Sequence, residues 1–178
     1  MDVLSSLGDG FVVARALAEA GFRPRLLFAG EPGRLPPDAL EMHDKWAALW
    51  SVEPLSALPS VLSGPRPALL VDALFGTGLS RDLTGPVVDA LTRLVAQIEG
   101  PWAGVPVLAL DVPSGLCADS GVARGPVLPA GVTVAFHCAK PGHFLAQGPD
   151  FCGHVVVADI GLASDRAADV TLIEAPVA

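Results

Sequence analysis

The sequence of 178 residues contains few cysteines and no cluster of basic residues. Its three cysteines, Cys117, Cys138 and Cys152, form no CxxC pair, so we expect neither a disulfide framework nor a zinc site. Lysine and arginine total 11 against 19 acidic residues, which gives a net charge of −8. This balance argues against a nucleic-acid-binding surface. It does not exclude an anionic small ligand, because helix N-termini can bind phosphate.

Long hydrophobic runs are also missing, although hydrophobic residues make up 51% of the chain and the mean hydropathy is +0.52. The apolar stretches, such as 127–139, are interrupted by proline or glycine or are too short to cross a bilayer. The first residues lack the basic and apolar segments of a signal peptide. We therefore expect no membrane association, and the cysteine usage favours a reducing, cytoplasmic location. The apolar excess predicts strands that are buried on both faces, as in parallel sheets.

The remaining pattern is an alternation of apolar strand-like segments and helical segments. Helices are expected at 11–20, 36–50 and 86–98. Strands are expected at 25–29, 68–74, 105–110, 132–136, 154–158 and 170–173. Residues 51–66, which are rich in proline and serine, are predicted to be a connection. There is no internal repeat, so the sequence predicts one α/β domain over residues 1–178 with a mostly parallel sheet.

Several of the expected strands run directly into polar or glycine-rich loops. The segments concerned are VDALFGTGLSRD, LDVPSG, AKPGH and ADIGL. In open α/β sheets, ligands bind outside the carboxyl ends of the strands. We therefore expect these four loops to gather at one edge of the sheet and to form a site there.

Two aspartates stand out at these strand ends, and each has two interpretations. Asp72 lies within an apolar strand, where it either bonds to loop amides or binds a cation. Asp111 begins the segment DVPSG, which is either a turn that ends the strand or an acid/base group with Ser114 as an oxygen ligand. Ser114 lacks the G-x-S-x-G context of a nucleophile. Lys140 is equally compatible with a phosphate contact and with a solvated loop position.

Four segments follow one another in this order: VDALFGTGLSRDLTGPV, LDVPSGLCADSG, AKPGH and ADIGL. Through these segments the chain resembles the NAD(P)H-hydrate epimerase family, also called the YjeF N-terminal domain. The likeness extends over nearly the whole chain, and DxPSGxxxDxG combined with DALFGTG is highly specific. The resemblance implies a Rossmann-like three-layer α/β/α fold and a homodimer. It also implies interconversion of the R and S forms of hydrated NADH and NADPH, with a bound potassium ion. The functional partner would be an NAD(P)H-hydrate dehydratase, which is often fused to the domain.

The resemblance also assigns roles to individual residues. It implies Asp111 as the catalytic group and Asp72, Ser114 and Ser6 as potassium ligands. A hard cation prefers such oxygen ligands, and a positioned carboxylate suits proton transfer at a hydroxyl-bearing carbon. The residues expected to bind the hydrated nucleotide are Gly8, Asp9, Gly76, Thr77, Gly78, Leu79, Ser80, Arg81, Asp82, Asp111 and Lys140.

The N-terminal segment departs from the family pattern. The family motif GNNGGDG corresponds here to LSSLGDG, in which Ser6 replaces an asparagine that binds potassium and Leu7 replaces a glycine. We expect the strand before this motif, and the helices upstream of it, to be missing or reduced, with only Val3–Leu4 left of the strand. Such a chain would be poorly stable or would dimerise, and would have weak or no activity. A catalytically silent nucleotide-binding or scaffold domain, and a coding region that starts further upstream, are the alternatives.

Overall fold

The computed structural model describes residues 1–5 and 8–162. A seven-stranded sheet is its central layer, with the strand order β3-β2-β1-β4-β5-β6-β7 and parallel pairing throughout. The strands are β1 (Asp2–Ser5), β2 (Arg25–Phe28), β3 (Val52–Pro54), β4 (Leu70–Ala73), β5 (Val107–Leu110), β6 (Val132–Phe136) and β7 (His154–Ala158). The helices are α1 (Gly8–Glu19), α2 (Pro37–Ala47), α3 (Leu58–Leu62), α4 (Pro86–Glu99) and α5 (Gly148–Cys152).

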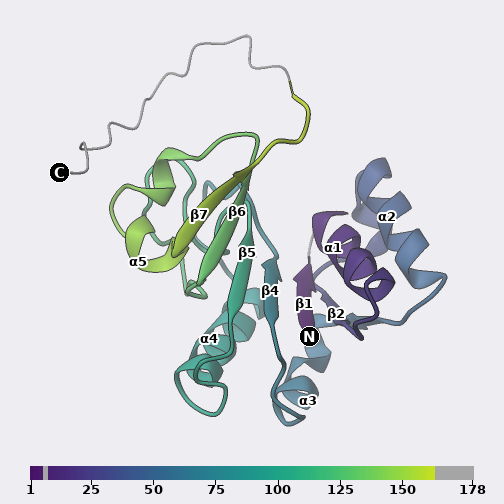
Figure 1. Cartoon of the computed structure of the whole chain (residues 1–178). Helices are drawn as coiled ribbons and strands as arrows, with labels where there is room; N and C mark the ends of the chain where they lie inside the picture. Colours follow the sequence, from purple (N-terminus) through teal and green to yellow (C-terminus); the bar gives the residue numbers. More distant parts are fainter. Residues whose placement is uncertain (6–7, 163–178) are drawn as a thin grey trace.

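Helices cover both faces of this sheet, which gives three layers (Figure 1). On one face, α1 and α2 contribute Phe11 and Trp46 to a core that includes Phe28 and Val71. On the other face, the second core gathers α3 and α4 against Leu70 and neighbouring strand residues. The predicted α/β class and three-layer architecture are therefore confirmed.

We expected the first strand to be missing or reduced to Val3–Leu4; a short strand, β1, is present and extends one residue beyond that pair at each end. β1 comprises four residues, as many as β2, β4 and β5. It pairs in parallel with β2 and with β4 along its whole length. Its Val3 is fully buried in the core beneath α1. The short segment therefore fills the position between β2 and β4, and it leaves no unpaired edge in the middle of the sheet.

Two further differences concern short or irregular segments. Residues 51–66, predicted to be a connection, contain the edge strand β3 and the short helix α3. The edge strand is held by Arg25 of β2, whose guanidinium donates to both carboxylate oxygens of Glu53 at 2.9 and 2.6 Å. The expected strand at 170–173 lies outside the described residues.

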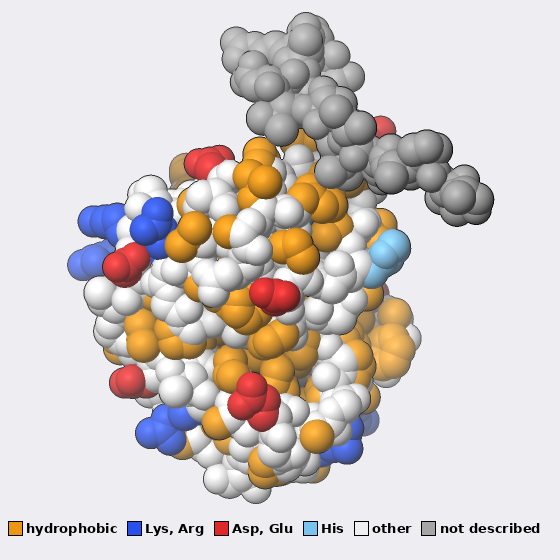
Figure 2. Space-filling model, turned by 90° about the vertical axis from the view of Figure 1, so that its left-hand side faces the viewer, with side chains coloured by type: hydrophobic (Ala, Val, Ile, Leu, Met, Phe, Trp, Pro, Cys, Tyr) orange, Lys and Arg blue, Asp and Glu red, His pale blue; other side chains and the backbone are white. Residues whose placement is uncertain are grey.

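The opposite edge of the sheet is more exposed than the sequence predicts. In β7, Val156 and Val157 are 41% and 49% exposed, so the expectation that apolar strands are buried on both faces fails there. Phe144 and Leu145, which precede α5, are also exposed. Figure 2 shows hydrophobic side chains over the middle of one face and lysine and arginine at its margins. Among the described residues, no helix combines the length and hydrophobicity needed to span a bilayer.

Candidate functional site

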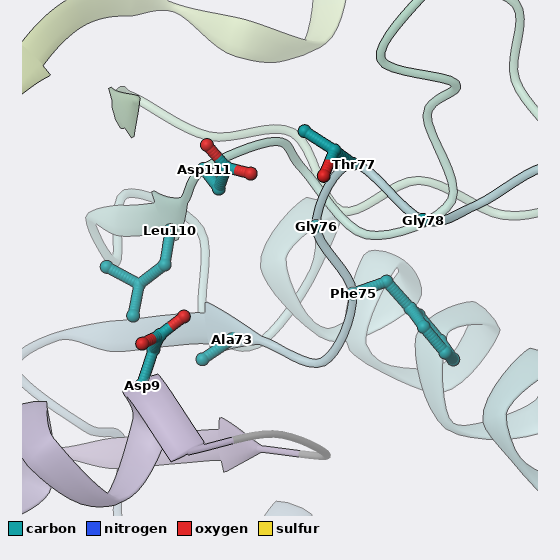
Figure 3. A pocket seen from close by; sticks show the side chains of 8 residues that line it. All are labelled: Asp9, Ala73, Phe75, Gly76, Thr77, Gly78, Leu110 and Asp111. Carbon is teal, nitrogen blue, oxygen red and sulfur yellow. The ribbon is translucent and has the colours of Figure 1, made fainter. Parts of the chain in front are cut away.

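A cavity of about 200 Å³ lies at the carboxyl ends of β4 and β5, beside the first turn of α1 (Figure 3). The residues that line it are Asp9, Ala73, Phe75, Gly76, Thr77, Gly78, Leu110 and Asp111. Two of the four loops predicted to gather here, those after β4 and β5, therefore meet at one sheet edge together with the start of α1, whereas AKPGH and ADIGL contribute no residue to this lining. A larger hollow of about 460 Å³ lies beside β3 and α2. It is lined mainly by apolar and aromatic groups, and none of its described lining residues carries a carboxylate.

Asp111 directly follows β5 and adopts a left-handed backbone conformation, with φ = 64°. Aspartate is one of the few residues with a side chain that tolerates this region. Its amide donates to the carbonyl of Val134 at 2.7 Å, and Oδ1 accepts the amide of Phe136 at 3.3 Å. The other carboxylate oxygen, Oδ2, lies beside Gly76, where an added Cβ would come within 3.1 Å of it. The absence of a side chain at position 76 thus lets the carboxylate face the cavity.

Lys140 is an ion-pair partner of Asp111, and it is not a solvated loop lysine. Its Nζ donates to Asp111 Oδ1 and to the carbonyl of Phe136, the latter at 2.8 Å. The side chains of Lys140 and Asp111 are only 14% and 15% exposed. The ammonium therefore compensates the charge of Asp111 at the edge of the cavity.

His143 contacts both Lys140 and Asp111 from the interior of the protein, and it is only 1% exposed. The backbone amide of Lys140 donates to its Nδ1 at 3.0 Å. Since an amide can only donate, Nδ1 carries no proton, and the proton of the neutral ring lies on Nε2. Nε2 then donates to the backbone carbonyl of Asp111 at 2.9 Å. Burial lowers the pKa of His143, and the positive charge of Lys140 acts in the same direction.

The lowered pKa of His143 predicts a loss of stability in acid. The folded state disfavours the charged imidazole, so below the ordinary pKa of 6.5 the unfolded chain binds more protons than the folded one. As the pH is lowered below 6.5, the free energy of unfolding should therefore decrease, by at most about 1.4 kcal/mol per pH unit. His143→Gln should lack this part of the acid sensitivity. Thermal melts of both proteins between pH 7.5 and 5 test this; parallel curves would contradict it.

Asp9 brings a second carboxyl group to the cavity from the first turn of α1. Although the residue as a whole is exposed, partial burial of its carboxyl raises its pKa, and the negative charges of Asp111 and Asp38 add to this. Gly8, expected to bind the nucleotide, begins the helix and lies against α2: a Cβ there would approach Ala39 Cα to 3.2 Å. Close packing of the two helices is thus a structural reason for this glycine.

The loop after β4 contributes only its first half to the cavity. Of the residues predicted to bind nucleotide in this loop, Gly76, Thr77 and Gly78 line the cavity, whereas 79–82 lie beyond its lining. Asp82 instead lies 3.6 Å from the guanidinium of Arg124. The neighbouring amide of Leu83 donates to the carbonyl of Arg124 at 2.7 Å, which anchors the end of the loop.

Asp72 and Ser114 form a buried pair behind the cavity, and both are fully inaccessible to solvent. The Ser114 hydroxyl donates to Asp72 Oδ1 at 2.5 Å, and the Ser114 amide donates to Oδ2 at 2.8 Å. Ser114 Oγ accepts the amide of Phe75, a residue of the cavity lining, at 3.0 Å. Burial raises the pKa of Asp72, while these hydrogen bonds act in the opposite direction. The two proposed ligands are therefore adjacent, as the sequence predicts.

Asp72 and Ser114 offer a carboxylate and a hydroxyl oxygen, which are the kinds of ligand that a hard cation prefers. Asp72 accepts hydrogen bonds from three neutral groups, the amide and the hydroxyl of Ser114 and the amide of Leu74. No described lysine or arginine forms an ion pair with it. A buried carboxylate normally needs a positive partner, and its oxygens offer about four acceptor positions. The described residues contain no group of three or more His, Cys, Asp or Glu side chains that could hold a metal ion. Ser6, the third expected ligand, lies outside the described residues.

The family described as YjeF-related protein N-terminus matches residues 6–142, which is well over half of the chain. This chain belongs to that family. The match covers the first helix, the loop after β4 and the DVPSG segment, so every residue that lines the cavity of this YjeF-related domain lies within the matched region.

Curated relatives and a solved structure agree with this assignment. The NAD(P)H-hydrate epimerase of Rhodobacter capsulatus is 43% identical over 87% of this chain and 68% of its own length. That of Roseobacter litoralis is 35% identical over 87% and 72%. The bifunctional NAD(P)H-hydrate repair enzyme of Salinibacter ruber is 36% identical, over 91% of this chain but 32% of its own length. The crystal structure of yeast ynu0 has a TM-score of 0.61 at 20% identity, covers 87% of this chain and 65% of that chain, and supports the fold alone.

The YjeF-related domain thus brings most of the predicted site residues together. Asp111 has an immediate environment that sequence reasoning missed, namely the ion pair with Lys140 and the buried His143. The apolar part of the lining, Ala73, Phe75 and Leu110, was also missed. The strand-end position of AKPGH could have indicated that Lys140 and Asp111 meet, but nothing in the spacing distinguishes a buried histidine from an exposed one.

Proposed function

We propose that this chain interconverts the R and S forms of hydrated NADH and NADPH. Two similar relatives, each matched over more than two thirds of its length, carry the name NAD(P)H-hydrate epimerase. The observation in this chain that supports the proposal is a carboxylate, Asp111, that faces a small cavity and is held there by Lys140. The reaction needs such a group at a hydroxyl-bearing carbon of the ring.

In the proposed mechanism, Asp9 and Asp111 move the protons at the substrate hydroxyl and at the returning water. One proton is delivered to the leaving hydroxyl as its bond to the ring carbon breaks, and Asp9, whose pKa is raised, is the cavity carboxyl group placed to deliver it. Asp111, ionised beside Lys140, removes one proton from the water that returns on the opposite face, and both carboxyl groups then exchange protons with solvent. Asp111 Oδ2 is the oxygen available to remove the proton from the water, since Oδ1 accepts from Lys140 and from the Phe136 amide. Asp9 lies on the cavity wall formed by α1 (Figure 3).

We propose further that the phosphates of the hydrated nucleotide bind between the start of α1 and the loop at 76–82. The amides of a helix N-terminus favour anionic groups, and Gly76 and Gly78 allow close approach of a ligand to the backbone. Gly8, Leu79, Ser80, Arg81 and Asp82 remain predicted contacts of the parts of the substrate that extend beyond the cavity.

Potassium is proposed as the cofactor, with Asp72 and Ser114 as ligands and Ser6 as the third. When bound, the ion would compensate the buried carboxylate charge and order the adjoining strand ends. We expect Asp72→Asn to lose any potassium dependence of substrate binding, because the charge that attracts the ion is removed. Dissociation constants measured in potassium and in tetramethylammonium test this. Equal affinity of the parent chain in both salts would argue against the ion.

The alternative is a catalytically silent nucleotide-binding or scaffold domain of the same fold. Two assays on the same preparation separate it from the first proposal: epimer interconversion followed by chiral chromatography, and binding of the hydrated cofactor by calorimetry. Interconversion at a catalytic rate supports the epimerase, whereas binding without interconversion supports the silent domain.

The proposed partners are an NAD(P)H-hydrate dehydratase and a second copy of this chain, and the proposed location is the cytoplasm. Relatives named bifunctional NAD(P)H-hydrate repair enzyme support the first, since their names describe a combined repair function and this chain matches about a third of their length. The exposed valines of β7 support the second. Analytical ultracentrifugation of the parent and of Val157→Asp tests whether this edge forms the dimer.

A further inference from the structure

The turn at residues 140–143 holds Asp111 at two points. Lys140 Nζ contacts the carboxylate at Oδ1, and His143 Nε2 donates to the backbone carbonyl of the same residue at 2.9 Å. Lys140 and His143 are also linked to each other, because the Lys140 amide donates to His143 Nδ1 at 3.0 Å. One short turn therefore contacts both the side chain and the main chain of the proposed acid/base group.

This turn is itself fixed to the segment that follows Asp111. The amide of Gly142 donates to the carbonyl of Ala118 at 2.6 Å. A Cβ at position 142 would lie 2.3 Å from the carbonyl oxygen of Cys117, so only glycine fits between the two segments. The turn therefore packs directly against residues 117–118, which follow the DVPSG segment.

We propose that His143 is a positioning residue of the reaction: it fixes the backbone of Asp111 and the loop of Lys140 without touching the substrate. This inference rests on the proposed epimerase function. The left-handed conformation of Asp111 is rarely populated by residues other than glycine and needs support from its surroundings. The neutral imidazole provides that support through one acceptor and one donor. Lys140 is thereby assigned to Asp111 instead of to a phosphate.

His143→Leu removes both hydrogen bonds while filling a similar volume, and His143→Gln retains one acceptor and one donor. We expect His143→Leu to lower kcat by about 10- to 100-fold, since small displacements of a reacting group have effects of this order. KM should change less than threefold, because the histidine does not contact the substrate. His143→Gln should recover most of kcat.

Thr133→Val is the matched control for a purely structural effect. Thr133 is fully buried in β6, and its hydroxyl donates to the carbonyl of Cys152 at 2.7 Å, away from the cavity. Its loss should lower Tm by an amount comparable to that of His143→Leu and leave kcat within twofold of the parent. Equal losses of kcat in the two variants, or an unchanged kcat in His143→Leu, would overturn the proposal.

Hydrogen exchange gives a readout that does not depend on turnover. The amide of Lys140 should exchange faster in His143→Leu than in the parent and in His143→Gln, as followed by NMR. Unchanged exchange in His143→Leu overturns the positioning role. If the parent chain shows no epimerisation while this exchange pattern holds, the proposed function fails and the arrangement around Asp111 stands.

Discussion

Asp111→Asn is expected to reduce epimerisation by about 10²–10⁴-fold, the usual contribution of a general acid/base group. Asparagine keeps the shape of the side chain and also tolerates the left-handed backbone that Asp111 adopts. Its amide oxygen can still accept from Lys140, so the turn at 140–143 should remain in place. The fold should therefore be retained, and the loss should appear in kcat measured with the separated epimers.

Asp89→Asn serves as the control for this prediction. Asp89 is an exposed carboxylate on α4, and it does not line the cavity with Asp111. The same chemical change there should leave kcat and Tm nearly unchanged. If Asp111→Asn turns over as fast as Asp89→Asn, Asp111 does not move the proton, and Asp9 becomes the remaining carboxyl group of the cavity for that role.

The sheet and the position of the site could be predicted from strand-end patterns. Strands such as β4 are buried on both faces and have a clear apolar signature, and in a parallel sheet their carboxyl ends must share one edge. Asp72 is the penultimate residue of β4, and Asp111 and Ser114 lie in the segment that directly follows β5. Their proximity therefore follows from topology and needs no knowledge of side-chain contacts.

Other features could not be predicted because they depend on tertiary contacts. β3 has three residues and includes Pro54, so it carries no local strand signal and depends on pairing with β2. His43 lies among charged residues in the sequence, yet its side chain is only 12% exposed and packs edge-on against Phe11 at 5.2 Å. Burial of a single histidine is set by the neighbouring helix, which a sequence pattern does not contain.

The length of β1 has a physical explanation of the same kind. A segment of four residues is too short for a periodic signal, so the sequence predicted a strand that is missing or reduced to Val3–Leu4. The structure shows that four residues are sufficient because both neighbouring strands pair with them. Hydrogen bonds on both sides and the burial of Val3 fix a segment that would not be ordered alone.

Val3→Asp is accordingly expected to be among the most destabilising single changes in this chain. The side chain of Val3 is fully buried in the core between the sheet and α1. A carboxylate there would have to lose its hydration or be expelled with the strand, at a cost of several kcal/mol. Since domains of this size are stable by only about 5–15 kcal/mol, the transition temperature should fall by ten degrees or more, or the chain should fail to fold.

Val12→Asp is the matched control, because Val12 lies on α1, the helix that covers Val3, and is 41% exposed. There the same substitution should change the free energy of unfolding by no more than about 0.5 kcal/mol. Circular dichroism melts and urea titrations of the two variants provide the comparison. If Val3→Asp is as stable as Val12→Asp, β1 does not lie between β2 and β4 in solution, and these two strands must be paired in another way. If it unfolds while Val12→Asp does not, the short first strand is required for the sheet that brings Asp9 and Asp111 together.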